Sequence, residues 1–176
     1  MNIAINGLGR IGKSVLKLLI ENNNINIALI NDLNPSIDNL CYLMNYDSVY
    51  ENSKIKFEPF KTNLIKYGNK FIKFSSKKNI KEINLRNIDV IVDSTGISWK
   101  ASDLNSIKKK IKHVIFTNIP KNLNYKYFLS DINLDKLNKK NFLISSGTCD
   151  GNAVVPIINL LQKNFTIEFG NITTLH

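Results

Sequence analysis

The sequence predicts an α/β protein built on a mostly parallel β-sheet. Short apolar segments of strand length alternate with segments of helical spacing, and a glycine-rich turn follows the first strand. The strand segment at residues 25–30 is apolar on both faces, which is typical of a parallel strand covered by helices on both sides. The length of 176 residues allows one large domain or two small ones.

The first half of the chain contains two strand–helix pairs and then antiparallel strands. A strand is expected over residues 2–6, and the helix after the glycine turn is expected to bury Val15, Leu16, Leu18 and Leu19. The next strand, 25–30, precedes a helix over 36–45 with Ile37, Leu40, Leu43 and Met44 at helical spacing. Strands are expected over 55–60, 64–67 and 70–74, the last two joined as a hairpin at Gly68 and Asn69.

The second half resumes the alternation. Strands are expected over 89–93, 113–117 and 142–145, with a helix over 101–111. The segment 121–140 is polar and rich in loops, although it contains too many apolar residues to be disordered. A helix over 149–162 and a final strand over 165–175 complete the expected elements.

Composition and cysteine content exclude several classes of protein. Hydrophobic residues make up 43% and charged residues 22%, which excludes collagen-like, coiled-coil and wholly disordered chains. The apolar run at residues 15–20 is broken by Lys17 and is too short for a membrane span of about 20 residues. No secretory leader is recognisable, and two cysteines are a poor basis for a disulfide framework. We therefore expect a reduced, cytoplasmic protein that does not insert into a membrane.

The net charge of +10 raises the question of a nucleic-acid partner. Only Arg10 and Arg86 are arginines, whereas the other basic residues are lysines spread along the chain. Nucleic-acid interfaces usually combine a clustered basic face with arginines or aromatic residues. The densest basic cluster, at residues 108–112, is better explained as a solvated helix face, so a nucleic-acid-binding domain is the least favoured alternative.

The glycines at positions 7, 9 and 12 form a Gly-x-Gly-x-x-Gly pattern between the first strand and the first helix. The first glycine permits the tight turn, the second lets the backbone approach a pyrophosphate, and the third lets helix and strand pack closely. Asp32 lies about 20 residues after Gly12, where a carboxylate accepts hydrogen bonds from ribose hydroxyls and repels a 2′-phosphate. The pattern predicts an NAD site in a Rossmann-type fold, against the alternative of a glycine turn with a chance aspartate.

The two cysteines occupy different surroundings. Cys149 follows a strand and a turn of small residues and begins a helix, whose positive end favours the thiolate. Cys41 lies among apolar residues at helical spacing and is expected to be a buried, inert side chain. His176 is of interest only as the partner of a thiol.

Several segments resemble the glyceraldehyde-3-phosphate dehydrogenase family. Residues 4–12 are similar to the family signature INGFGRIG, and residues 145–156, SSGTCDGNAVVP, to the active-site stretch SNASCTTNCLAP. Shorter segments at 30–33, 46–49, 67–70, 94–96, 117–120 and 173–176 resemble other family motifs in the same order, with Tyr50 at a position where histidine is usual.

The resemblance implies NAD as cofactor and assigns its site. Arg10 and Ile11 would offer backbone groups to the pyrophosphate, and Asp32 the ribose contact. Lys77 occupies the position of an arginine near the adenine, and Thr117 would lie near the nicotinamide. The remaining implied cofactor-site residues are Gly7, Gly9, Gly12, Thr95 and Gly96. No metal is implied.

The resemblance also implies a covalent mechanism. Cys149 would add to the aldehyde of glyceraldehyde 3-phosphate or a similar aldehyde phosphate, and His176 would act as its acid–base partner. Hydride transfer to NAD would leave a thioester, which inorganic phosphate would release as an acyl phosphate. Thr148 and Asp150 would lie beside the substrate.

Two departures from the family pattern are apparent. Asp150 and Gly151 replace two threonines, and a carboxylate in a phosphate pocket repels the anion. Family enzymes are also roughly twice as long. Residues 1–148 would therefore form the NAD-binding domain and residues 149–176 the beginning of a truncated catalytic domain, within an enzyme expected to be a homotetramer when complete. The alternatives are a non-catalytic NAD-binding module and a related erythrose-4-phosphate dehydrogenase.

Overall fold

The structure is a computed structural model that describes residues 1–47 and 53–175. Its strands are β1 (Asn2–Asn6), β2 (Asn26–Asn31), β3 (Phe57–Phe60), β4 (Leu64–Tyr67), β5 (Lys70–Ser75), β6 (Val90–Asp93), β7 (His113–Phe116), β8 (Lys126–Tyr127) and β9 (Leu143–Ser145). Its helices are α1 (Arg10–Ile20), α2 (Ile37–Asn45), α3 (Ala101–Ile107) and α4 (Cys149–Asn164), with short 3-10 turns η1 (Ile80–Glu82) and η2 (Leu134–Lys136).

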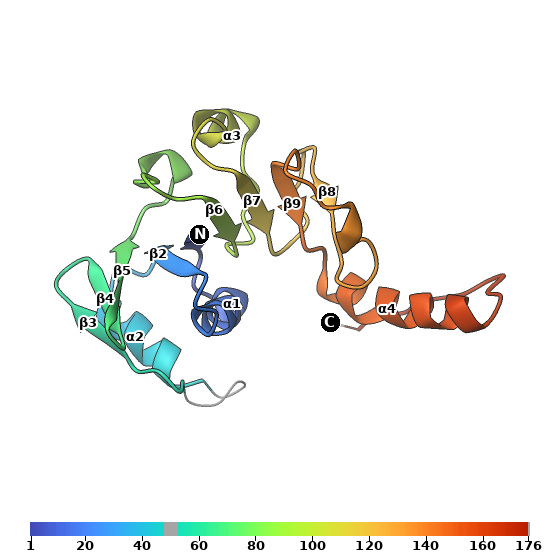
Figure 1. The fold of residues 1–176 in the computed structure, drawn as a ribbon, viewed down its shortest axis with the longest axis horizontal. Coiled ribbons are helices and arrows are strands. Elements are labelled where there is room, and N and C mark those ends of the chain that lie inside the picture. The colour runs from blue at the N-terminus through green and yellow to red at the C-terminus, as the bar shows by residue number, and fades with distance from the viewer. Residues whose placement is uncertain (48–52, 176) are drawn as a thin grey trace.

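The described strands form one sheet in the order β3-β4-β5-β2-β1-β6-β7-β9-β8 (Figure 1). The pairs from β5 and β2 through to β9 and β8 are parallel, whereas β3, β4 and β5 pair antiparallel. Central strand β1 is paired on both sides, with Ile3 opposite Ile27 of β2 and Val90 of β6. The predicted α/β fold with a mostly parallel sheet is confirmed.

Two hydrophobic cores cover the two faces of the sheet, with α1 and α2 on one side and α3 on the other (Figure 1). Ile3 and Ile5 of β1 belong to the core that contains Leu16 of α1. Ala4, between them in the sequence, belongs to the core that contains Leu104 of α3. This alternation follows from the two-residue period of a strand and explains why both faces of these strands are apolar.

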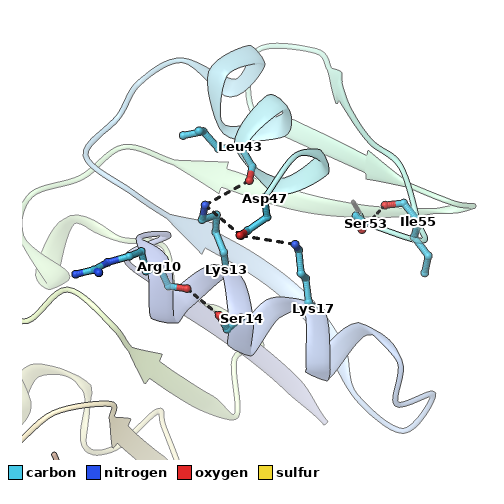
Figure 2. Close-up of polar contacts among 8 residues, drawn as sticks. All are labelled: Arg10, Lys13, Ser14, Lys17, Leu43, Asp47, Ser53 and Ile55. Carbon is cyan, nitrogen blue, oxygen red and sulfur yellow. Dashed lines mark hydrogen bonds and ion pairs between the residues drawn. The ribbon is translucent and has the colours of Figure 1, made fainter. Parts of the chain in front are cut away.

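Asp47 ties helix α1 to the segment that follows α2, as Figure 2 shows. Its Oδ2 atom lies 3.4 Å from Nζ of Lys13 and 3.7 Å from Nζ of Lys17, and its side chain is only 8% exposed. The Lys13 ammonium also donates to the carbonyl of Leu43 across 3.5 Å. These contacts connect α1, the helix that begins at the glycine turn, to the C-terminal end of α2.

Two leucines expected to be buried are on the surface instead. Leu18 is 71% exposed and Leu43 is 37% exposed. Each comes two residues after a buried residue, Leu16 or Cys41, and two residues turn a helix by about 200°. Both leucines therefore face away from the sheet, because only one narrow stripe of each helix contacts it.

Other differences from the expected elements concern the second half. Helix α3 ends at Ile107 rather than at residue 111, and β8 was not expected because two residues carry no readable alternation. Residues 165–175, expected as a strand, have no strand structure and are almost all exposed. A strand needs a neighbouring strand to accept its hydrogen bonds, and the described part of the chain offers none there. Ser48, Val49 and Tyr50 of one family-like segment, and the catalytic candidate His176, lie outside the described residues.

Candidate functional site

The glycine turn between β1 and α1 meets the three requirements of a dinucleotide site. Gly7 has φ +88°, and a Cβ added to it would lie 2.9 Å from the backbone of Ser94 and Thr95. A Cβ at Gly12 would overlap the carbonyl oxygen of Gly7. At Gly9, by contrast, an added Cβ would meet no described atom within 4 Å. The space above Gly9 is therefore open to a ligand, whereas the other two glycines permit close packing.

Helix α1 begins at this open space. Gly9 is its N-cap residue, and no described side chain caps the first turn. The leading N–H groups of a helix lack partners within the helix and carry a partial positive charge. Arg10 and Ile11, both exposed, are the first two residues of this turn, so their N–H groups are available to a phosphate.

Asp32 follows β2 directly and reaches back to the glycine turn. Its Oδ2 accepts a hydrogen bond from the N–H of Leu8 across 2.6 Å, and its Oδ1 accepts one from the N–H of Asn34 across 2.8 Å. Each carboxylate oxygen has two lone-pair directions, so acceptor capacity remains for a ligand hydroxyl. The carboxylate is half-buried at the rim of the cavity described next.

A cavity of about 590 Å³ lies at the carboxyl ends of β1, β2 and β6. It brings together five of the residues predicted for the cofactor: Gly7, Gly9, Asp32, Lys77 and Thr95. The other predicted residues, Arg10, Ile11, Gly12, Gly96 and Thr117, do not line it. Thr117 follows β7 and donates its N–H to the carbonyl of Asp93, one strand away from the cavity.

Asn31 holds Lys77 at the wall of this cavity. Its Oδ1 accepts from the N–H of Lys77, and its Nδ2 donates to the carbonyl of Lys77, both across 2.9 Å. The same Nδ2 donates to Oδ1 of Asn6 across 2.8 Å. The backbone of Lys77 is therefore fixed by the last residue of β2 rather than by its own segment alone.

A buried carboxylate, which the sequence reasoning did not identify, supports the floor of the cavity. Asp93, fully buried at the end of β6, accepts hydrogen bonds from Asn6 Nδ2 at 2.7 Å and Trp99 Nε1 at 3.0 Å through Oδ2. Its Oδ1 accepts from the hydroxyl of Thr95 at 2.8 Å and the N–H of Thr95 at 3.3 Å. Burial raises the pKa of Asp93, and these hydrogen bonds partly offset that effect. The sequence did carry a signal for this network, because three buried strands each end on a polar residue: Asn6, Asn31 and Asp93.

Ser94 is among the residues that line the cavity, and its buried Oγ has no hydrogen-bond partner among the described residues. Because this oxygen has almost no accessible surface, it is not offered to a ligand in the cavity. The open space at Gly9 and the uncapped start of α1 are the features that fit a dinucleotide.

Cys149 begins α4 on a separate turn that follows β9. Thr148 is the N-cap, and its Oγ1 accepts from the N–H of Gly151 across 3.1 Å. The side-chain amide of Asn152 donates to the carbonyls of Ser146 and Thr148, both across 2.8 Å. The Cys149 thiol is exposed, and its Sγ lies 3.6 Å from Oδ1 of Asp150.

Comparison with known proteins decides the family. Residues 1–101 match the family described as "Glyceraldehyde 3-phosphate dehydrogenase, NAD binding domain". The chain belongs to the glyceraldehyde-3-phosphate dehydrogenase family. The resemblance of the motifs is thus confirmed, and the Rossmann-type domain is the NAD-binding domain of this family.

Curated relatives match the whole chain. Glyceraldehyde-3-phosphate dehydrogenase of Mycoplasma pneumoniae is 33% identical over 182 residues, which cover 100% of this chain and 52% of that protein. Glyceraldehyde-3-phosphate dehydrogenase 1 of Kluyveromyces marxianus is 34% identical over 181 residues, covering 100% and 53%. Glyceraldehyde-3-phosphate dehydrogenase 2 of Staphylococcus aureus (strain MRSA252) is 31% identical over 179 residues, covering 99% and 52%. The chain spans about half the length of these relatives.

Cys41 is buried, as the sequence predicts. The side chain of Cys41 is 3% exposed. Burial raises the pKa of its thiol to about 11, with smaller contributions from the carboxylates of Asp38 and Glu58.

Among the described residues, no helix is long and apolar enough to cross a membrane.

Proposed function

We propose that the chain is the NAD-binding half of an enzyme that oxidises glyceraldehyde 3-phosphate, or a similar aldehyde phosphate, with NAD and inorganic phosphate. The observation that carries this proposal is the cavity that Gly7, the helix N-cap Gly9 and Asp32 line together. Gly9 and the N–H groups at the start of α1 would hold the pyrophosphate of NAD, and the bound cofactor would supply a hydride acceptor. The charge of Asp32 favours NAD over NADP, because it repels a 2′-phosphate.

Cys149 is proposed as the nucleophile. Its exposure at the start of α4 supports this role, since the helix N-terminus favours a thiolate. The thiolate would add to the aldehyde carbon, and His176 would protonate the resulting oxyanion and later remove that proton as hydride leaves. The thioester so formed on Cys149 would be cleaved by phosphate, which takes the acyl group and returns the thiolate.

The carboxylate of Asp150 is unfavourable for the binding of inorganic phosphate beside Cys149. This carboxylate lies in the first turn of α4, next to the thiol, and opposes both an approaching anion and the thiolate. Thr148, whose hydroxyl is already engaged as the helix cap, is proposed to lie beside the substrate. This arrangement is the observation that favours the alternative of a non-catalytic NAD-binding module.

Residues 149–176 are proposed as the beginning of a catalytic domain. Helix α4 extends away from the sheet (Figure 1). None of its described residues is buried, and Ile157, Leu160 and Leu161 are exposed. Such a helix face is stable only when another structure covers it, which the remaining half of a complete family enzyme would provide. We propose that the complete enzyme is a cytoplasmic homotetramer, and that an erythrose-4-phosphate substrate is the alternative within the same chemistry.

The test combines binding with complementation. Calorimetric titration of the purified chain should show NAD binding tighter than NADP binding. Aldehyde oxidation, followed by NADH absorbance, should require phosphate and the C-terminal half of a family enzyme supplied as a second chain. It should be lost in Cys149→Ser. Turnover by Cys149→Ser would remove the nucleophile from the proposal, and NAD binding without any complemented turnover would favour the non-catalytic module.

A further inference from the structure

The ring of Tyr127 packs against the turn that carries Cys149. A Cβ added at Gly147 would overlap Cε2, Cζ and Oη of this ring. A Cβ added at Gly151 would lie 2.8 Å from Oη of Tyr127, closer than real Cβ atoms approach another atom. The ring therefore occupies the space of two side chains, one on each side of Cys149 in the sequence.

The position of Tyr127 is fixed by its backbone. Tyr127 pairs with Ser145 at the edge of the sheet, and its carbonyl accepts from Nδ2 of Asn133 across 2.9 Å. The N–H of Phe128 donates to the carbonyl of Ser145 across 3.0 Å. These bonds hold the backbone of β8 on both sides of the tyrosine, so the Cα from which the ring projects is fixed beside the turn. Ser145 in turn ends β9, which leads directly into the Cys149 turn.

One contact accounts for both glycines, since neither position can carry a Cβ while the Tyr127 ring is present. Gly147 also has φ +83°, which a side chain would strain independently.

We propose that Tyr127 is a positioning residue for Cys149: its ring substitutes for the side chains missing at Gly147 and Gly151 and holds the nucleophile turn. This inference rests on the proposed role of Cys149. It predicts that position 151 and the Tyr127 hydroxyl compete for the same space, because without Oη the nearest ring atom to the added Cβ is Cζ at 3.9 Å. An alanine at position 151 should therefore fit beside phenylalanine but not beside tyrosine.

The experiment is a double-mutant cycle of Gly151→Ala and Tyr127→Phe, read by the pH profile of Cys149 alkylation and by Tm. Gly151→Ala alone should lower Tm by roughly 2–4 °C, as overpacking does in a chain of this size. It should also change the rate of Cys149 alkylation about threefold or more, because the turn is displaced. In the Tyr127→Phe background, Gly151→Ala should no longer lower Tm and should raise it slightly, because alanine favours the helix more than glycine does and the one remaining close contact is with Thr148 Oγ1 at 3.3 Å. Alkylation of Cys149 should stay at the rate of Tyr127→Phe alone. Gly170→Ala is the control, because an added Cβ there meets nothing within 4 Å among the described residues.

Three results would overturn the proposal. An effect of Gly151→Ala that is equal in both backgrounds would show that the hydroxyl is not the obstacle. No effect in either background would show that the ring moves aside. A coupled change in Tm without any coupled change in alkylation would show that the ring packs but does not position the thiol. Alkylation needs neither NAD nor turnover, so these results are independent of a failed complementation test.

Discussion

The backbone N–H of Leu8 donates a hydrogen bond to Oδ2 of Asp32 across 2.6 Å. A carboxylate predicted to contact a ribose therefore also holds the middle of the glycine turn. Its second oxygen accepts from the N–H of Asn34, so the side chain is oriented before any ligand arrives. Fixing the carboxylate in advance reduces the entropy that binding must overcome.

Asp32→Asn should weaken NAD binding about tenfold or more, because a hydrogen bond to a charged acceptor contributes about 1.5–3 kcal/mol. NADP binding should weaken less, since the variant no longer repels the 2′-phosphate, and the preference for NAD should narrow. Calorimetric titration of both dinucleotides measures this. Asp38→Asn, an exposed aspartate in the first turn of α2, is the control. An unchanged ratio of the two affinities would exclude the assigned role of Asp32.

Gly9→Ala should reduce NAD affinity, whereas Gly12→Ala should reduce the stability of the fold. The added methyl at Gly9 enters the open space, so stability should be unchanged while NAD affinity falls about tenfold. The methyl at Gly12 overlaps the Gly7 carbonyl and should cost about 1–3 kcal/mol of stability. Urea unfolding and NAD titration on both variants test the contrast. Normal NAD affinity in Gly9→Ala would place the pyrophosphate elsewhere.

Iodoacetamide should alkylate Cys149 and spare Cys41 in the folded chain at neutral pH. Cys149 is exposed, whereas burial makes Cys41 inaccessible and raises its pKa to about 11. Mass spectrometry of each cysteine peptide provides the measurement, and unfolding in urea should expose Cys41. Preferential labelling of Cys41 without unfolding would contradict the structure.

The pKa of Cys41 also predicts an alkaline loss of stability. The folded protein favours the protonated thiol of Cys41. The stability that this preference contributes is fully present below pH 9.0, the ordinary pKa of a cysteine thiol, and is lost as pH rises toward the folded pKa of about 11. Cys41→Ala removes the titrating group, so its unfolding free energy should fall less over that interval. Parallel declines in both proteins would assign the loss to other groups.

Asp93→Asn should destabilise the fold by about 1–3 kcal/mol, because an amide NH₂ would face hydrogen-bond donors. Burial raises the pKa of Asp93, so its stabilising contribution is fully present below the ordinary carboxyl pKa and declines as pH rises through the folded value. The difference between the wild type and this variant should therefore narrow as pH rises. Trp99, the single tryptophan, reports unfolding directly.

Asp103→Asn is the matched control for Asp93. Asp103 forms a partly exposed pair with Lys81 at 2.9 Å, and such pairs contribute at most about 1 kcal/mol. It also accepts from the N–H of Lys100 across 3.0 Å at the start of α3, a contact that the amide oxygen of asparagine can keep. A control as unstable as Asp93→Asn would show that the loss of any aspartate charge, rather than the buried network, causes the effect.

Local patterns predicted most of the fold. Apart from β8, the strands of the parallel sheet follow from apolar spacing and turn residues that act within a few positions, as do the helices α1, α2 and α4 and the hairpin at Gly68 and Asn69. The glycine spacing and Asp32 likewise predicted the NAD-binding domain, because a strand–turn–helix fixes where three glycines are needed.

Contacts between distant segments could not be predicted in the same way. Leu18 has the apolar character of a core residue, yet it faces away from the sheet. Residues 165–175 have the composition of a strand but lack a neighbour with which to pair among the described residues. In both cases the structure depends on which distant segments pack against the residue or pair with the segment, and the spacing of apolar residues carries no information about those neighbours.

By itself, the sequence determined the type and order of the elements and the chemistry of the glycine turn, because these depend on backbone sterics and apolar spacing over short distances. Only the tertiary structure decided which polar groups meet. Asp93 became the buried acceptor for Asn6 and Trp99, and Tyr127 came to fill the space beside Gly147 and Gly151. The reason is physical: burial, hydrogen bonding and steric exclusion act between atoms brought together by sheet pairing, whatever their separation along the chain.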